Sequence, residues 1–417
     1  MNLKSHNFQL IPEITHYDNK GNKVKTISYP PKNVFMDKDN NITLTLYDVD
    51  GTVKDVFMVP FRSFNHNFAT VNNIRLTTLA SNVTTKDTGG TNRTLQAYWN
   101  KYGYIAPTPA NVSTWGIQVG ASGSATATQS IDTYKLAAQI NHGTGNGQLA
   151  HSACVHDTSL TDISGSVKWS IHRTFTNSSA ANVNVKEVGW VANVYSAQYK
   201  ILYARDIKDS NGNDINVTVA PAQVLTIDYN FFLPKEGGMN KTWLGFFASE
   251  CNDIVAIPSA RNDVGKDDYY DTAAANAVQG NYHNYYGAGV GVEWNGMMVG
   301  TGTATESCHT PGSVANYITH GSGSGQLMFN ENVADGEVDT YSTSGSAAEW
   351  NLRRVFTNYH SDPITITEAM IIGSLGTQYL DGIKTNNKSI IARKLTGNQT
   401  IPSGSSLEIN FKFMIEA

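Results

Sequence analysis

The chain has 417 residues, a formal net charge of −5 and only 16% charged residues. Because it lacks a basic stripe, we expect no nucleic-acid partner. Because no apolar run approaches the roughly 20 residues of a membrane helix, we expect no membrane association. Gly, Ser, Thr, Asn and Tyr are abundant, which favours strands joined by tight turns.

The cysteines and the first residues bear on the compartment. Cys154, Cys251 and Cys308 are far apart in the sequence, and an odd, unpatterned set is not a disulfide framework. Such usage favours a reducing cytoplasm. The opening MNLKSHNFQL lacks the apolar core of a signal peptide, so we expect no ordinary secretion.

Residues 1–60 predict a small β-rich N-terminal arm. The segment NITLTLYDV at residues 41–49 alternates polar and apolar residues, as a half-buried strand does, and turn-forming residues flank it. We expect this arm to act as the anchor of the protein, by adding a strand to a partner sheet. The alternative is that it completes the sheet of the first repeat.

The rest of the chain is an internal duplication. WSIHRTFTN at Trp169 is matched by WNLRRVFTN at Trp350, and HGTGNGQL at 142–149 is matched by HGSGSGQL at 320–327. The closing segment LTIDYNFF at Leu225 is matched by LEINFKFM at Leu407. A repeat of this length indicates two copies of one domain, which we place at residues 61–235 and 236–417.

Within each repeat, short alternating segments separated by turns predict strands without intervening helices. The fold class is therefore all-β, with two tandem β-sandwich, jelly-roll-like repeats after the N-terminal arm. One segment, TYKLAAQI at 133–140, is compatible with a helical turn or with another strand.

The most faithfully repeated polar residues suggest packing roles. An Arg precedes each Phe-Thr-Asn, and a Glu occupies a matching position on the next strand, so we expect an ion pair in each repeat, with a ligand-binding Arg as the alternative. The Asn of each Phe-Thr-Asn is expected to end a strand and start a turn. The residues concerned are Arg173, Glu187 and Asn177 in the first repeat and Arg354, Glu368 and Asn358 in the second.

One string suggests an enzyme. LYDVDGTV at 46–53 resembles the first motif of the haloacid-dehalogenase-like phosphatases, which implies Asp48 as nucleophile and Asp50 as acid/base beside Mg²⁺, with Lys266-Asp267-Asp268 as a distant acidic motif. That family needs alternating strands and helices, which this sequence does not predict. A hairpin turn explains the string, so we expect no enzyme and no catalytic residue.

Metal-binding patterns are weak. His142, His151, Cys154 and His156 are residue types that bind Zn²⁺, but the region matching the last three in the second repeat retains none of them. The segments at 18–22 and 209–214 resemble calcium loops without the required downstream Glu. We therefore expect no metal and no cofactor.

The repeated pattern of HG-x-G-x-GQL, R-x-FTN, a Glu strand, A-R-(D/K) and a closing alternating strand is similar to duplicated β-domains of tailed-bacteriophage virion proteins, including podovirus-like and crAss-like gut phages. This resemblance covers both repeats. It implies a non-enzymatic structural role as a head fibre or capsid decoration protein, assembled into the virion in the bacterial host cytoplasm.

The same resemblance implies other virion proteins of the capsid or tail as partners, together with a homo-oligomer. The alternatives are a phage tail component and a carbohydrate-binding or adhesin β-sandwich that binds a host surface glycan. Matched exposed aromatic residues in both repeats would favour the glycan alternative. Trp169 and Trp350 match, but their positions on alternating strands predict core residues.

Overall fold

A computed structural model describes most of the chain. The described residues are 8–34, 42–59, 64–70, 83–95, 108–123, 130–158, 160–164, 166–194, 199–235, 239, 244, 296–302, 316–330, 347–380, 383–416. They form an all-β structure of antiparallel sheets, which confirms the predicted fold class at this level, with a helical turn at residues 66–70. Within these ranges no helix is long and apolar enough to cross a membrane.

The first large sheet has the strand order β10-β11-β16-β4-β5, and β9 also pairs with β11. Its central strands alternate buried and partly exposed residues, because one face lies against the core and the other toward solvent. Its strands are β4 (Ile42–Tyr47), β5 (Val53–Val59), β9 (Ala150–His156), β10 (Thr161–Ile163), β11 (Ser166–Thr176) and β16 (Val224–Leu233).

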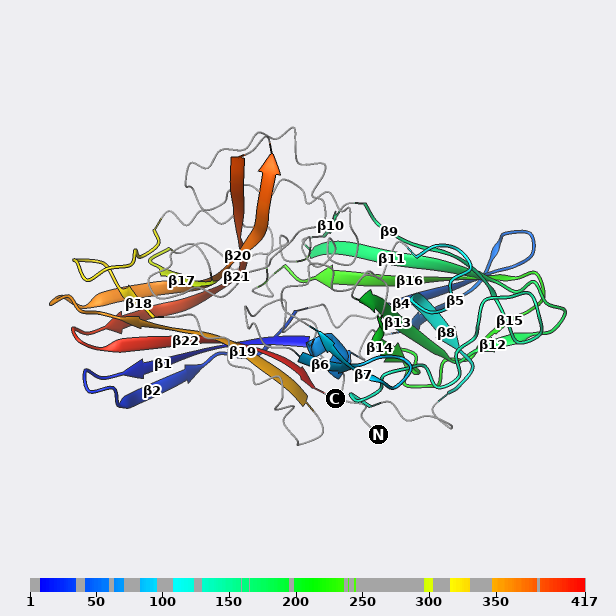
Figure 1. The fold of residues 1–417 in the computed structure, drawn as a ribbon, viewed down its shortest axis with the longest axis horizontal. Coiled ribbons are helices and arrows are strands. Elements are labelled where there is room, and N and C mark those ends of the chain that lie inside the picture. The colour runs from blue at the N-terminus through cyan, green and yellow to red at the C-terminus, as the bar shows by residue number, and fades with distance from the viewer. Residues whose placement is uncertain are drawn as a thin grey trace.

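The second large sheet has the matching order β18-β19-β22-β1-β2, and β3 also pairs with β1. The two large sheets lie at opposite ends of the molecule in Figure 1. The strands of this sheet are β1 (Phe8–Tyr17), β2 (Lys23–Ser28), β3 (Lys32–Asn33), β18 (Met328–Phe329), β19 (Ala347–Thr357) and β22 (Ser406–Glu416).

A smaller sheet accompanies each large one, with the orders β14-β13-β8 and β17-β20-β21. In the second repeat β20 and β21 are long enough to include the counterparts of β12 and β15, which form a separate ladder in the first. The strands are β6 (Val83–Lys86), β7 (Asn92–Leu95), β8 (Gly116–Gly120), β12 (Val183–Val185), β13 (Glu187–Val194), β14 (Tyr199–Asp206), β15 (Val217–Val219), β17 (Gly296–Gly300), β20 (Ile364–Leu380) and β21 (Ile383–Ile401).

Aromatic packing joins the small sheet to the large sheet in the first repeat. Trp190 of β13 is fully buried, and its ring lies 5.0 Å from that of Phe231 and 6.2 Å from that of Tyr229, both on β16. Every residue of β13 is buried, so the small sheet is covered on both faces. Two facing layers therefore enclose the core of this repeat.

The described strands of the N-terminal segment pair with the last strands of the two repeats and do not form a separate arm. Strand β1 pairs with β22, the last strand of the chain, along ten residues from Phe8 to Tyr17. Strand β4 pairs instead with β16, the last strand of the first repeat. The expected division at residue 60 is thus corrected: the β1–β2 hairpin completes the second large sheet, and the β4–β5 hairpin completes the first. The reason is that β22 and β16 would otherwise each leave an open strand edge, which a hairpin covers.

The two hairpins are themselves a short repeat. Thr15, Tyr17-Asp18, Gly21 and Pro30 recur 30 residues later as Thr45, Tyr47-Asp48, Gly51 and Pro60. The two hairpins pair with their sheets in equivalent registers: Ile14 lies opposite Ile409, and its counterpart Leu44 lies opposite Ile227. Both turns need a residue with positive φ, which glycine adopts without steric cost: φ is 79° at Gly21 and 82° at Gly51.

Two other expectations concern particular segments. TYKLAAQI forms neither a helical turn nor a regular strand, and meets β8 through an isolated bridge between Gln139 and Gly120. The expected boundary between the repeats, at residues 235 and 236, adjoins residues 236–238, which lie outside the described ones.

Candidate functional site

Arg173 does not pair with Glu187, contrary to the sequence-based expectation. Its guanidinium donates to the backbone oxygens of Ser152 and Ile117, each at 3.0 Å, and to those of Trp115 and Val112. Arg173 belongs to β11 and Ile117 to β8, so the side chain ties the large sheet to the small sheet. Burial lowers the pKa of this guanidinium. Backbone carbonyls satisfy its donors in place of a carboxylate.

Arg354 has the equivalent role in the second repeat. It is 1% exposed, and its guanidinium donates to the backbone oxygens of Asn330 and Met297, each at 2.9 Å. Met297 lies on β17, the counterpart of β8. Here too the contact joins β19 of the large sheet to the small sheet, which explains why the R-x-FTN pattern is repeated.

The buried carboxylate of Glu187 has a different cationic partner. Arg205 Nε lies 2.5 Å from Glu187 Oε2, and the two side chains are 3% and 0% exposed. Arg205 lies opposite Gly189 on the neighbouring strand, so it shares a face with Glu187. Backbone amides of Ala137 and Ala138 also donate to the carboxylate, which gives TYKLAAQI its structural role.

The second repeat holds the same ion pair between Glu368 and Arg393, at 3.3 Å and 2% and 6% exposed. Glycines make room for both carboxylates. A Cβ atom on Gly120 would come within 2.2 Å of Glu187 Oε1, and one on Gly302 within 2.1 Å of Glu368 Oε1. The A-R-(D/K) repeat therefore carries the sequence signal for the pairing that the Arg173–Glu187 expectation missed.

The HG-x-G-x-GQL loops also hold backbone in place. His142 Nδ1 accepts from the amide of His151, and His320 Nδ1 accepts from that of Phe329, each at 3.0 Å. In both loops the Gln side chain accepts a backbone amide and fills the space beside a glycine, Gly143 in the first copy. The repeated His and Gln thus fix the start of β9 and of β18.

Asn177 and Asn358 end strands, as predicted. Asn177 Nδ2 donates to Ala181 O and Val219 O, and Asn358 Nδ2 donates to Asp362 O and Ile401 O, at 2.8–2.9 Å. Both are fully buried. Each therefore closes the turn after the long strand and joins it to the neighbouring ladder.

Asp48 and Asp50 lie in the predicted hairpin turn, between β4 and β5. The amide of Gly51 donates to Asp48 O, and Asp50 accepts from the amide and the hydroxyl of Thr52. The Thr52 hydroxyl and amide lower the pKa of the Asp50 carboxyl. The amide of Val49 and the side chain of Gln223, which donate to the Asp48 carboxylate, lower the pKa of that carboxyl. The calcium-like segment at Asp18 forms the equivalent turn. Lys266-Asp267-Asp268 lies outside the described residues.

The His/Cys cluster does not converge on a common point. Cys154 is fully buried in β9, and burial raises the pKa of its thiol to about 11. His151 packs against His142 and Phe175, whereas His156 packs against the ring of Trp169. Across the described ranges, no three His, Cys, Asp or Glu side chains are placed to hold a metal ion. Cys251 and Cys308 are not among those residues.

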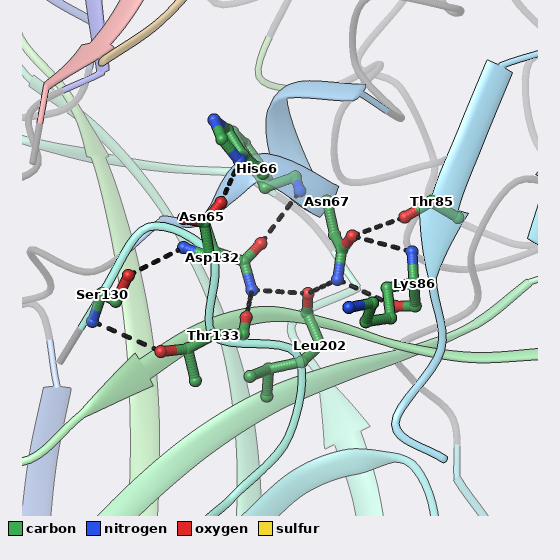
Figure 2. Close-up of polar contacts among 10 residues, drawn as sticks. Asn65, His66, Asn67, Thr85, Lys86, Ser130, Asp132, Thr133 and Leu202 are labelled. Atoms are coloured by element: carbon green, nitrogen blue, oxygen red, sulfur yellow. Dashed lines mark hydrogen bonds and ion pairs between the residues drawn. The ribbon is translucent and has the colours of Figure 1, made fainter. Parts of the chain in front are cut away.

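A polar network around the helical turn 66–70 was not anticipated (Figure 2). Asn65 accepts from the amide of Phe68 and donates to Leu202 O and Thr133 O, so it caps the turn and ties it to β14. Asn67 donates to the same Leu202 O and accepts from Thr85. An Asn three residues before Phe68 is the cap signal that the sequence contains.

The same network contains a close contact between a histidine and an aspartate. His66 Nδ1 lies 2.6 Å from Asp132 Oδ1, and burial lowers the pKa of His66 more than the carboxylate raises it. Ser130 lies beside them, but its hydroxyl accepts from the amide of Asp132 (Figure 2). A serine nucleophile would bond to the histidine, so this arrangement supports packing.

The exposed outer strands of the two hairpins form the candidate interaction surface. Strands β2 and β5 are the last strands of the two large sheets, and each pairs with only one strand among those described. Four residues on these hairpins expose large apolar side chains: Val24, Val49, Val53 and Val56, at 45–69%. An unpaired strand edge can accept another strand.

Comparison with protein-family models, with curated proteins and with solved structures gives no match for this chain.

Proposed function

We propose that this chain is a structural component of a bacteriophage virion, a head fibre or capsid decoration protein. In this proposal each repeat is a jelly-roll-like β-sandwich, and the partners are other virion proteins of the capsid or tail. The chain acts without a catalytic residue, a cofactor or a metal. Its similarity to duplicated virion β-domains in the R-x-FTN and HG-x-G-x-GQL patterns motivates the assignment.

One observation carries the proposal: the most faithfully repeated polar residues work inside the fold. In both repeats the Arg joins two sheets, the Glu pairs with a cation on a neighbouring strand, and the Asn closes a turn. The duplicated pattern therefore specifies a scaffold. On the outside, the two large sheets expose equivalent edge strands, β2 and β5, to which strands of other proteins could add.

A glycan-binding role would be favoured by matched exposed aromatic residues. Trp169 does not supply one, because its side chain is fully buried and its indole nitrogen donates to Asp157 O. The side chain of Trp350 lies outside the described residues. A tail component remains the nearer alternative, since it needs the same scaffold and the same edges.

The location is tested on particles. Antibodies against the purified protein are used for immunogold microscopy and for density-gradient fractions of the phage preparation that carries the gene. We expect the protein to sediment with particles and gold to label the head. Label on the tail would support the tail alternative, and protein found only in particle-free fractions would contradict a virion role.

A further inference from the structure

We propose that copies of this chain associate head to tail, with the edge strand β2 of one copy pairing with the edge strand β5 of the next. The partner is thus a second copy of the same chain. This inference is carried by the two hairpins alone and does not depend on the virion assignment.

Among the described residues, nothing pairs with most of the length of these two edges. Residues 19–26 are all exposed, as are residues 49–56. On β5 the amide of Ser210 donates to Met58 O, so the loop at Ser210 covers only the end of that edge. The remaining stretch from Val53 to Phe57 is long enough to add a strand by main-chain hydrogen bonds.

The hairpins have the same turn but opposite charge. Residues 18–26 carry three Lys and one Asp, a net +2, and residues 48–56 carry three Asp and one Lys, a net −2. At two equivalent positions, 30 residues apart, Lys in the first hairpin is replaced by Asp in the second. These positions are Lys20 with Asp50 and Lys25 with Asp55.

The four charges at these twin positions have no ion-pair partner in the described part of the chain. Among the described residues, Lys20, Lys25 and Asp55 make no ion pair, and Asp50 bonds only within its own turn. A second hairpin of opposite charge would supply the missing counter-ions. It would also cover exposed valines such as Val24, which is 64% exposed.

Charge also decides which edges meet. Pairing β2 with β2 would oppose lysines, and pairing β5 with β5 would oppose aspartates, so both symmetric dimers are disfavoured. Pairing β2 with β5 leaves one free edge of each kind. The turns of the two hairpins lie at opposite ends of the molecule (Figure 1), so repeated pairing gives a line or a ring of copies.

The test is charge reversal followed by mixing, read by sedimentation velocity of the full chain. We expect the wild type to associate with rising concentration at ~20 mM salt and to dissociate at ~500 mM. Lys20→Asp/Lys25→Asp should weaken association at least about tenfold, and so should Asp50→Lys/Asp55→Lys, because each makes both edges alike in charge. Each substitution places a residue that its twin position already carries.

Mixing the K20D/K25D protein with the D50K/D55K protein should restore association, since every copy then finds an edge of opposite charge. The control is Lys135→Asp/Lys235→Asp, which changes the net charge by the same amount as K20D/K25D, at exposed lysines outside the hairpins, and should leave association unchanged. Circular dichroism checks that all variants are folded. A monomeric wild type at low salt, or association that neither reversal weakens, would overturn the proposal.

Discussion

Replacing Ile14 by Ala is expected to destabilise the C-terminal half of the protein, although Ile14 lies near the N-terminus. Its side chain is 1% exposed and lies opposite Ile409 of β22. Leu44, its counterpart in the second hairpin, is fully buried and lies opposite Ile227 of β16. Leu44→Ala should therefore destabilise the first repeat, and the two variants are matched controls for each other.

The magnitude follows from burial. Truncating a buried Ile or Leu to Ala removes about 2–5 kcal/mol of stability, through lost transfer free energy and the cavity left behind. Each hairpin forms the outer part of its sheet, where neighbours can relax, so about 3 kcal/mol is expected for Ile14→Ala. Since 1.4 kcal/mol is a factor of ten, amides protected by opening of that sheet should exchange about 100-fold faster.

Hydrogen exchange with mass spectrometry of proteolytic fragments locates the effect. For Ile14→Ala, faster exchange is expected in fragments from β19 and β22, with β11 and β16 unchanged; Leu44→Ala should give the opposite pattern. Faster exchange in β11 and β16 for Ile14→Ala would refute the strand pairing on which the reasoning rests. Equal changes in both repeats would refute their separate completion by the two hairpins.

Three further outcomes follow from the contacts. Arg205→Met should lower the free energy of unfolding by about 3–5 kcal/mol in denaturant titrations, because Glu187 stays buried without its cation; a double-mutant cycle should couple Glu187 to Arg205 more strongly than to Arg173, and the reverse order would contradict the assigned pair. Burial lowers the pKa of His151 from 6.5 to about 4, so on acidification the unfolded chain takes up a proton at this histidine before the folded chain does. The stability contributed by the neutral histidine should therefore fall as the pH drops from about 6.5 to about 4. Thermal melts of His151→Gln should depend less on acid than those of the wild type, and an unchanged acid dependence would count against this role of His151. The chain should not hydrolyse a generic phosphate ester with Mg²⁺, and turnover that Asp48→Asn abolishes would show that the turn is a catalytic site.

Local patterns in the sequence were sufficient for several features. Alternating residues in NITLTLYDV and LTIDYNFF predict the strands β4 and β16, because side chains on a strand point to opposite faces in turn. The Asp-Gly step in DVDGT predicts the turn after Tyr47, because glycine adopts the positive φ that the turn requires. These predictions depend only on residues that are neighbours in the chain.

The partner of Glu187 could not be read from spacing alone. The sequence contains two arginines that recur in both repeats, Arg173 and Arg205 in the first. Either arginine could lie beside the carboxylate of Glu187, depending on which strands are neighbours. Only the register of β13 with β14 places Arg205 beside Glu187, while Arg173 faces the other sheet and meets backbone oxygens. The A-R-(D/K) repeat marked the correct residue without showing what it contacts.

The sequence by itself determined that the chain is all-β and duplicated, since alternation and repeated motifs are properties of the linear order. It also contained the repeat of the two hairpins, in Tyr17-Asp18 and Tyr47-Asp48. Only the tertiary structure decided that the first hairpin completes the second large sheet and the second hairpin the first. The physical reason is that β16 and β22 have equivalent edges, and which hairpin reaches which edge depends on packing between segments far apart in the chain.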